Sequence, residues 1–186
     1  SGDAAFTIRQ TWDQEPNGFD RPVYVSEPAN ARGKVPVVIY FHGGGGRADG
    51  SIRKWARAFP DHLVVAPQGY SNSWNVQGEQ SKAPDVTFFE TLIDEIGKRY
   101  HDADMDKVSL IGSSNGAAYI YRLLIEVDED LFRTAVPQVS SLMESQFHDE
   151  SFWKSRDESD TDNLDTKADP RKNGRRILYI HGTDDG

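Results

Sequence analysis

A serine flanked by glycines is the residue with the clearest chemistry in this chain. Gly112–Gly116 matches the pattern G-x-S-x-G, with a short apolar run before it and a helical pattern after it. Glycines permit the strained turn that lifts the Ser114 hydroxyl out at the carboxyl edge of a sheet and aims the Asn115 N–H at the same point. We therefore predict that Ser114 is a nucleophile, with an ordinary glycine-rich turn as the alternative.

A run of glycines offers a second part of the same chemistry. His42 is followed by four glycines, Gly43–Gly46, directly after an apolar run that ends at Phe41. Glycines leave backbone N–H groups unshielded, so the loop can donate hydrogen bonds to a developing oxyanion. We predict that Gly44 is the donor that joins Asn115. The sequence patterns of phosphate-binding loops are absent, and a flexible glycine turn is the remaining alternative.

The last apolar run of the chain leads into an acidic turn. The segment Ile180–Asp185 reads Ile-His-Gly-Thr-Asp-Asp and places two carboxylates at the predicted carboxyl edge of the sheet. When a triad nucleophile follows a strand in this way, the order along the chain is serine, acid, histidine. An acid in this turn is therefore placed to orient a histidine, although a strand followed by an acidic turn is commonplace by itself.

Metal chemistry is not expected. The acidic run Asp102–Asp106 invites comparison with a calcium loop, but Lys107 stands where that loop needs glycine and Ser113 where it needs a bidentate glutamate. We expect a solvated turn between a helix and a strand instead. None of the five histidines has metal-ligand spacing to another, and the absence of cysteine excludes thiolate sites, disulfides and a cysteine nucleophile.

The elements that must position these residues alternate between strands and helices. Buried strands next to amphipathic helices indicate βαβ units, so the fold class is α/β, with a mostly parallel sheet covered by helices on both faces. The predicted strands are Phe6–Trp12, Val23–Val25, Val35–Phe41, Leu63–Pro67, Val108–Ile111, Ala135–Val139 and Ile177–Ile180. The predicted helices are Ser51–Phe59, Asp85–Tyr100 and Asn115–Val127.

Length and charge limit the domain organisation and the partners. The 186 residues fit one domain, 1–186, interrupted by a charged insertion at about 144–176. The insertion is interpreted as a solvated loop, or as a cap over a site because Phe147, Phe152 and Trp153 are costly to leave in water. A net charge of −9 and the lack of an apolar run of ~20 residues argue against nucleic acid and membrane partners.

The order of the motifs resembles a known family, the secreted α/β-hydrolase esterases that include polyhydroxybutyrate depolymerases, feruloyl esterases and related carbohydrate esterases. The similarity runs from about Val35 to the end of the chain. The segments that carry it are His42–Gly44, Val65–Gly69 with Trp74-Asn75 behind it, Asp85–Phe89, Asp106–Val108, Gly112–Gly116 and His181–Asp185.

This resemblance implies an α/β-hydrolase fold and a serine esterase that forms an acyl-enzyme on Ser114. It makes Asp185 the acid of the triad, Gly44 and Asn115 the oxyanion donors, and Trp74 a wall of the substrate pocket. The implied substrate is a small or polymeric ester of the feruloyl or aryl, acetyl-sugar or hydroxyalkanoate type. The resemblance implies no cofactor and no metal, and a secreted or periplasmic location.

The chain departs from the family in three respects. It lacks the cysteines of the family, the insertion is longer than expected, and the sequence ends at Gly186 before the catalytic histidine of the family. His148, inside the insertion, is the one histidine of the chain that could swing over the site. We expect instead that a C-terminal segment of the same protein brings a histidine to Ser114 and Asp185.

Two further interpretations stay open at this stage. The same triad serves peptidases and acyltransferases, because it determines the reaction class and not the leaving group. A protein of the same fold without catalytic activity could bind a carbohydrate or polymer surface.

Overall fold

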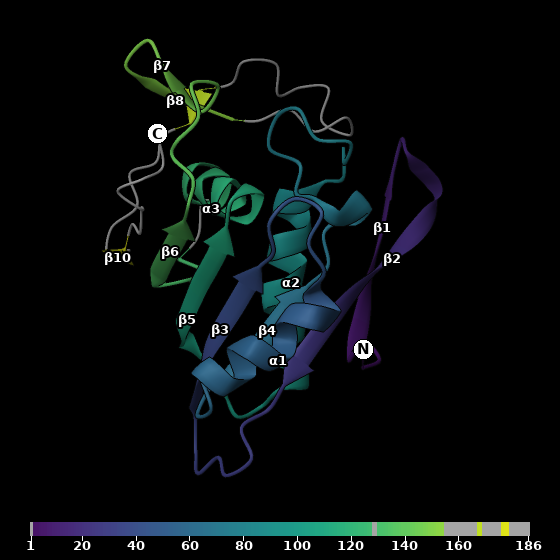
Figure 1. Cartoon of the computed structure of the whole chain (residues 1–186), viewed down its shortest axis with the longest axis vertical. Coiled ribbons are helices and arrows are strands. Elements are labelled where there is room, and N and C mark those ends of the chain that lie inside the picture. The colour runs from purple at the N-terminus through teal and green to yellow at the C-terminus, as the bar shows by residue number, and fades with distance from the viewer. Residues whose placement is uncertain (1, 128–129, 155–166, 169–175, 179–186) are drawn as a thin grey trace.

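The computed structural model of the chain describes residues 2–127, 130–154, 167–168 and 176–178. Within these residues the main feature is a seven-stranded sheet with the strand order β1-β2-β4-β3-β5-β6-β10 (Figure 1). Its strands are β1 (Phe6–Trp12), β2 (Glu15–Ser26), β3 (Val35–Phe41), β4 (Leu63–Pro67), β5 (Ala103–Ser113), β6 (Thr134–Gln138) and β10 (Arg176–Ile177).

Strands β4, β3, β5, β6 and β10 are parallel, and β1 and β2 form an antiparallel hairpin at one edge. The prediction of a mostly parallel sheet is confirmed. Strand β2 is much longer than the predicted Val23–Val25, because its first half, which contains Pro16 and Gly18, pairs with β1 and so overrides its low strand propensity. Leu178 extends the pairing of β10 through a hydrogen bond to Ala135, whereas Ile180 lies outside the described residues.

Helices cover both faces of the sheet, as the sequence predicts. They are α1 (Ala48–Ala58), α2 (Asp85–Arg99) and α3 (Asn115–Glu126), with a 3-10 turn at Tyr70–Asn72. Figure 1 shows α1 on the near face and α2 on the far face. Within the described residues, no helix combines the length and apolar content that crossing a membrane requires.

The alternation of side chains along β3 divides the core between the two faces. Val37 and Phe41 are fully buried on the face that α2 and α3 cover. Val38 and Tyr40 point to the opposite face, where they pack against Trp55 of α1. Because β3 is buried on both sides at the centre of the sheet, the chain that follows Phe41 leaves the sheet from a rigid position.

The acidic run before β5 differs from the expected turn. Pro36 pairs with Asp104, but the next residue, Val37, pairs with Val108, so residues 105–107 form a bulge inside the strand. Lys107 Nζ lies 3.3 Å from Asp104 Oδ2 across this bulge. The predicted turn is present only at His101 and Asp102. From Ala103 onward the prediction of a turn was wrong, because pairing with β3 draws these residues into the sheet, although Asp106 and Lys107 remain exposed as expected.

The described part of the insertion forms a second, three-stranded antiparallel sheet of β7 (Phe147–His148), β8 (Ser151–Trp153) and β9 (Lys167–Ala168). The Phe147 and Phe152 rings pack 4.8 Å apart, and buried Gln146 donates from Nε2 to the Ala118 oxygen of α3 at 3.3 Å. Figure 1 shows this small sheet beyond α3, at the end of the molecule to which the parallel strands point. Its role as a cap stays a prediction.

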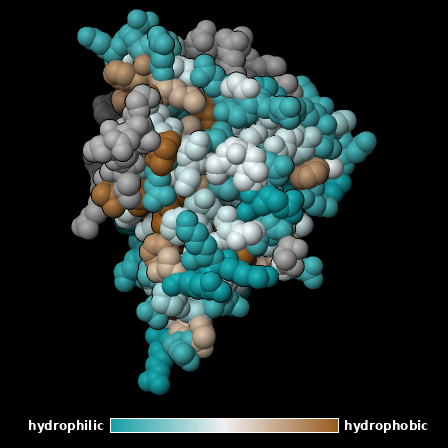
Figure 2. Space-filling model, viewed as in Figure 1, coloured by the Kyte–Doolittle hydropathy of each residue, from teal (hydrophilic) through white to brown (hydrophobic). Residues whose placement is uncertain are grey.

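The exposed apolar side chains are concentrated near the end of the described chain. Figure 2 shows a face dominated by hydrophilic residues, with the hydrophobic ones gathered mainly on the side of β6. Among the described residues, the large apolar side chains that are exposed are Val139, Phe147 and Leu178. All three lie beyond β6 in the sequence.

Candidate active site

Ser114 occupies a strained turn between strand β5 and helix α3. Its φ of 51° and ψ of −117° place a non-glycine residue in a sparsely populated backbone region, at a cost of about 1–3 kcal/mol. The turn is held because the Ser114 N–H donates to the Gln138 oxygen at 2.9 Å and the Ser114 oxygen accepts from Ala117 at 2.8 Å. The Ser114 side chain is exposed. The predicted strand, serine and helix arrangement is thus present in the structure.

The glycines on either side of Ser114 are required by close backbone contacts. A Cβ atom at Gly112 would overlap the carbonyl oxygen of Gly116, and one at Gly116 would overlap the carbonyl oxygen of Phe41. These atoms belong to the backbone and cannot rotate away. The G-x-S-x-G pattern is therefore the local condition for bringing β5, α3 and the end of β3 together.

The glycine loop after β3 lies against the serine turn. A Cβ atom added at Gly43 would lie 3.6 Å from Ser114 Cβ, and one added at Gly44 would lie 3.8 Å from Asn115 Cβ. The Gly45 N–H donates to the Asn72 oxygen at 2.8 Å. Within the described residues, no hydrogen bond uses the N–H groups of Gly43, Gly44 or Asn115. Unpaired donors beside an exposed hydroxyl are what stabilisation of an oxyanion requires.

Buried His42 holds this loop in place. Its Nε2 accepts hydrogen bonds from the Gly69 N–H at 2.9 Å and from the Gln68 amide at 3.1 Å, so its Nδ1, 2.7 Å from the Gly43 oxygen, carries the proton. Both ring nitrogens are occupied, which leaves His42 no free nitrogen to act as a general base. Burial lowers the pKa of His42 below its ordinary value and keeps the ring neutral.

This burial predicts a dependence of stability on pH. Because the pKa of His42 is lower in the folded chain than in the unfolded chain, the unfolded chain binds the proton more readily. The free energy of unfolding should fall as the pH is lowered from 7 to 5, by up to about 1.4 kcal/mol per pH unit from one such group. Urea unfolding at several pH values gives the free energy of unfolding as a function of pH. The slope of that free energy against pH should be smaller for His42→Gln than for the wild type.

The pKa of partly buried His62 is also lowered by burial, so its contribution must be measured separately. A His62→Gln variant gives that contribution. An unchanged slope in His42→Gln would contradict the assignment of the pH dependence to His42.

Trp74 lies beneath the site and not in its wall. Its side chain is 0% exposed, stacks on Tyr119 at a ring distance of 4.7 Å and donates from Nε1 to the His42 oxygen at 2.9 Å. The structure therefore differs from the expectation that Trp74 lines the substrate pocket. Sequence motifs place Trp74 near the site, but the direction of its ring is set by packing against α3.

A buried ion pair supports the same segment of chain. Arg21 Nη1 lies 2.7 Å from Asp85 Oδ1, and both side chains are 0% exposed. The Arg21 guanidinium lies 3.7 Å from the centre of the Phe88 ring, and Asp85 Oδ2 accepts the Asn75 N–H at 2.6 Å. Sequence reasoning missed this pair, since Asp85 was interpreted as the first residue of a helix and as part of a family motif, with no partner assigned to it.

The remaining parts of the predicted triad fall largely outside the described structure. Asp185 and His181 lie outside the described residues. His148 is described, and its exposed ring stacks on Trp153 and contacts the Glu144 oxygen at 3.0 Å through Nδ1. No hydrogen bond from the described residues reaches the Ser114 hydroxyl.

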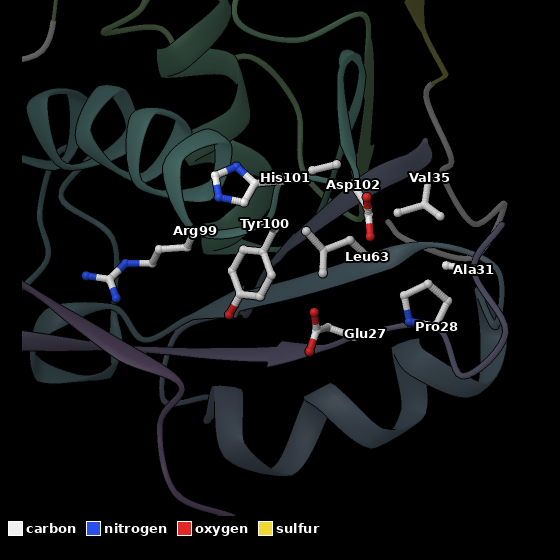
Figure 3. Close-up of a pocket in the computed structure, with 10 residues that line it drawn as sticks. Glu27, Pro28, Ala31, Val35, Leu63, Arg99, Tyr100, His101 and Asp102 are labelled. Carbon is white, nitrogen blue, oxygen red and sulfur yellow. The ribbon is translucent and has the colours of Figure 1, made fainter. Parts of the chain in front are cut away.

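The described residues hold no group of three potential metal-ligating side chains. A hollow of about 420 Å³ lies at the amino edge of the parallel strands, where Val35 and Leu63 begin β3 and β4 (Figure 3). Its polar lining residues are Glu27, Arg99, Tyr100, His101 and Asp102. Ser114 is at the other end of these strands, so this hollow does not belong to the candidate active site.

Comparison with solved structures decides the fold. The chain matches poly(aspartic acid) hydrolase-1 from Sphingomonas sp. KT-1 with a TM-score of 0.56 at 18% identity, over 73% of this chain and 56% of that one. It matches a thermostable esterase with a TM-score of 0.53 at 20% identity, over 71% of this chain and 40% of the other. The chain has the α/β-hydrolase fold.

Sequence comparison is less specific. No family model matches the chain. Tabersonine synthase from Catharanthus roseus is 23% identical over 171 residues, which covers 71% of this chain and 52% of that protein. The chain thus spans about half the length of the curated relative that it matches.

Proposed function

We propose that this α/β-hydrolase chain carries the nucleophile of a serine esterase that cleaves carboxylic esters. The observation that supports the proposal is the strained, exposed Ser114 with the unpaired N–H groups of Gly44 and Asn115 beside it. Strain at a non-glycine residue is retained where the surrounding structure enforces it, and active sites are a common place for it.

The arrangement suits attack on an acyl carbon. Ser114 Oγ forms a bond to the ester carbonyl carbon, and the carbonyl oxygen becomes an oxyanion that accepts hydrogen bonds from Gly44 and Asn115. A histidine takes the serine proton and returns it to the leaving alcohol as the C–O bond breaks. Water then attacks the acyl-enzyme in the same way and releases the acid.

We propose that this histidine belongs to a C-terminal segment of the same protein and that Asp185 orients it. Strand β10 runs parallel to β6, which is the direction that the predicted acidic turn requires. Among the described histidines, His42 has both ring nitrogens bound and His148 stacks on Trp153. His62 and His101 lie shortly before β4 and β5, at the end of the parallel strands opposite Ser114. A histidine from another segment is therefore the simplest completion of the triad.

The substrate class is proposed from the resemblance to polyhydroxybutyrate depolymerases and feruloyl esterases. Aryl, acetyl-sugar and hydroxyalkanoate esters all fit the chemistry of Ser114. The rings of Phe147, Phe152 and Trp153 suit an aromatic acid or a polyester chain equally well. A secreted or periplasmic location is part of the same proposal.

The full-length protein provides the test. It should hydrolyse an aryl ester faster than a matched peptide anilide, and a fluorophosphonate probe should label Ser114. Dominant turnover of the anilide would favour a peptidase. A full-length protein that leaves the probe unreacted would instead favour a binding protein without catalytic activity.

Gly44 offers a prediction specific to the oxyanion donor. Gly44→Val should lower kcat by about 10²-fold with a smaller change in KM, because the branched side chain pushes the loop away from Asn115. Gly44→Ala is the matched control, since its Cβ would meet only Asn115 Cβ, at an ordinary 3.8 Å. Steady-state kinetics of the two variants decide the matter: a loss confined to KM would make this loop a pocket wall and not an oxyanion donor.

A further inference from the structure

The side chain of Asn115 is fixed on both of its polar atoms. Oδ1 accepts the Trp74 N–H at 2.7 Å, and Nδ2 donates to the Trp74 oxygen at 3.0 Å and to Glu79 Oε1 at 3.0 Å. The main-chain N–H of the same residue, next to Ser114 in the chain, makes no hydrogen bond within the described residues. The amide therefore determines where the first residue of α3 sits relative to the segment after Trp74.

Glu79 joins that amide to its own loop. Its Oε2 accepts the N–H of Val76 at 3.0 Å and the N–H of Gln77 at 2.7 Å, while Oε1 accepts from Asn115. One carboxylate thus receives hydrogen bonds from two segments that lie 36 residues apart. Hydrogen bonds to an ionised carboxylate are stronger than those between neutral groups.

We propose that Glu79 is a positioning residue, which fixes the main-chain N–H of Asn115 as an oxyanion donor for Ser114. This inference rests on the esterase function proposed above. The contribution of Glu79 is geometric and not electrostatic: a negative charge close to the site disfavours the developing oxyanion, so the carboxylate helps only by holding Asn115.

A glutamine at this position cannot reproduce the arrangement. Its single oxygen can face either Asn115 Nδ2 or the N–H groups of Val76 and Gln77, and its NH₂ group then meets a donor on the other side. Glu79→Gln should therefore lower kcat about tenfold with KM changed less than about twofold, a smaller loss than the ~10²–10³-fold that follows removal of an oxyanion donor. Asn115→Ala keeps the main-chain N–H but removes the anchor, and it should give a similar fall.

A double variant that exchanges the carboxylate and the amide between positions 79 and 115 separates positioning of Asn115 from a general disturbance of the fold. Asn115→Asp places two carboxylates side by side, so kcat should fall further than in Glu79→Gln. Adding Glu79→Gln to Asn115→Asp should then raise kcat above that of Asn115→Asp, because the glutamine NH₂ donates to the new aspartate while its oxygen accepts from Val76 and Gln77. The rise should stop short of the wild-type kcat, since the hydrogen bond from Asn115 Nδ2 to the Trp74 oxygen is still lost. If Glu79 and Asn115 acted independently of each other, their effects would add and the double variant would be worse than either single one, which would contradict the positioning role.

The measurements are kcat, KM and thermal midpoint for the full-length enzyme with an aryl acetate. Glu27→Gln is the matched control, since it makes the same chemical change on an exposed side chain at the opposite edge of the sheet. Activity lost in Ser114→Ala but kept in both Glu79→Gln and Asn115→Ala overturns the positioning role and leaves the esterase intact. Activity kept in Ser114→Ala overturns the esterase proposal itself.

Discussion

Replacing Ser114 with alanine should abolish ester hydrolysis by the full-length protein, with kcat lowered by at least about 10⁴-fold. Loss of a triad nucleophile leaves only the catalysis that the oxyanion donors and substrate binding provide. The thermal midpoint should change little, because alanine keeps the Cβ atom at a positive φ and the exposed hydroxyl takes no part in packing. Ester turnover and thermal unfolding of the same preparation measure both effects.

Ser113 is the natural control for this experiment. It stands beside Ser114 in the same motif, but its hydroxyl donates to the Gln138 side chain at 3.3 Å and lies within the sheet. Ser113→Ala should keep kcat within a few-fold of the wild type. If Ser114→Ala retained activity within tenfold of the wild type, Ser114 would not be the nucleophile.

Asp85→Asn should destabilise the protein by about 3–5 kcal/mol, the largest stability effect expected for a single substitution here. Arg21 and Asp85 are both 0% exposed and lie 2.7 Å apart, so the change leaves a guanidinium buried without its counterion. Asparagine has nearly the same shape as aspartate, which separates the loss of charge from a loss of packing. Urea unfolding followed by tryptophan fluorescence measures the difference in free energy of unfolding.

Two further variants test whether the loss of stability in Asp85→Asn comes from the unpaired buried charge of Arg21. Asp20→Asn breaks the exposed pair with Arg9, in which the charges lie 3.1 Å apart, and should cost less than about 1 kcal/mol. The double variant Arg21→Met with Asp85→Asn removes both buried charges and should be more stable than Asp85→Asn alone. A double variant less stable than the single one would show that the pair contributes through its geometry and not through its charges.

The buried pair also connects stability to the site. Asp85 accepts the Asn75 N–H, and the neighbouring residue Trp74 is hydrogen-bonded to both His42 and Asn115. The segment from Trp74 to Asp85 is therefore fixed by the buried ion pair at one end and by hydrogen bonds to His42 and Asn115, next to Ser114, at the other. This is why residues far from the Ser114 hydroxyl in sequence can affect its surroundings.

The sequence by itself determined those features that depend on local pattern. Apolar runs with β-branched residues predict β3 and β4 with the observed bounds, and the spacing of apolar residues predicts α2 and α3 to within one residue of their ends. The strained turn at Ser114 was also predictable from the flanking glycines. Backbone segments pass so close to Gly112 and Gly116 that a Cβ atom at either position would overlap a carbonyl oxygen. Each of these signals lies within a few neighbouring residues.

Only the tertiary structure decided the features that join distant segments. The burial of Trp74, the pairing of Arg21 with Asp85 and the link between Asn115 and Glu79 depend on which segments the sheet order brings together. The same holds for the long strand β2, whose polar first half is paired because β1 lies beside it. Local periodicity carries no information about such neighbours, since one side chain can be exposed or buried depending on what folds over it.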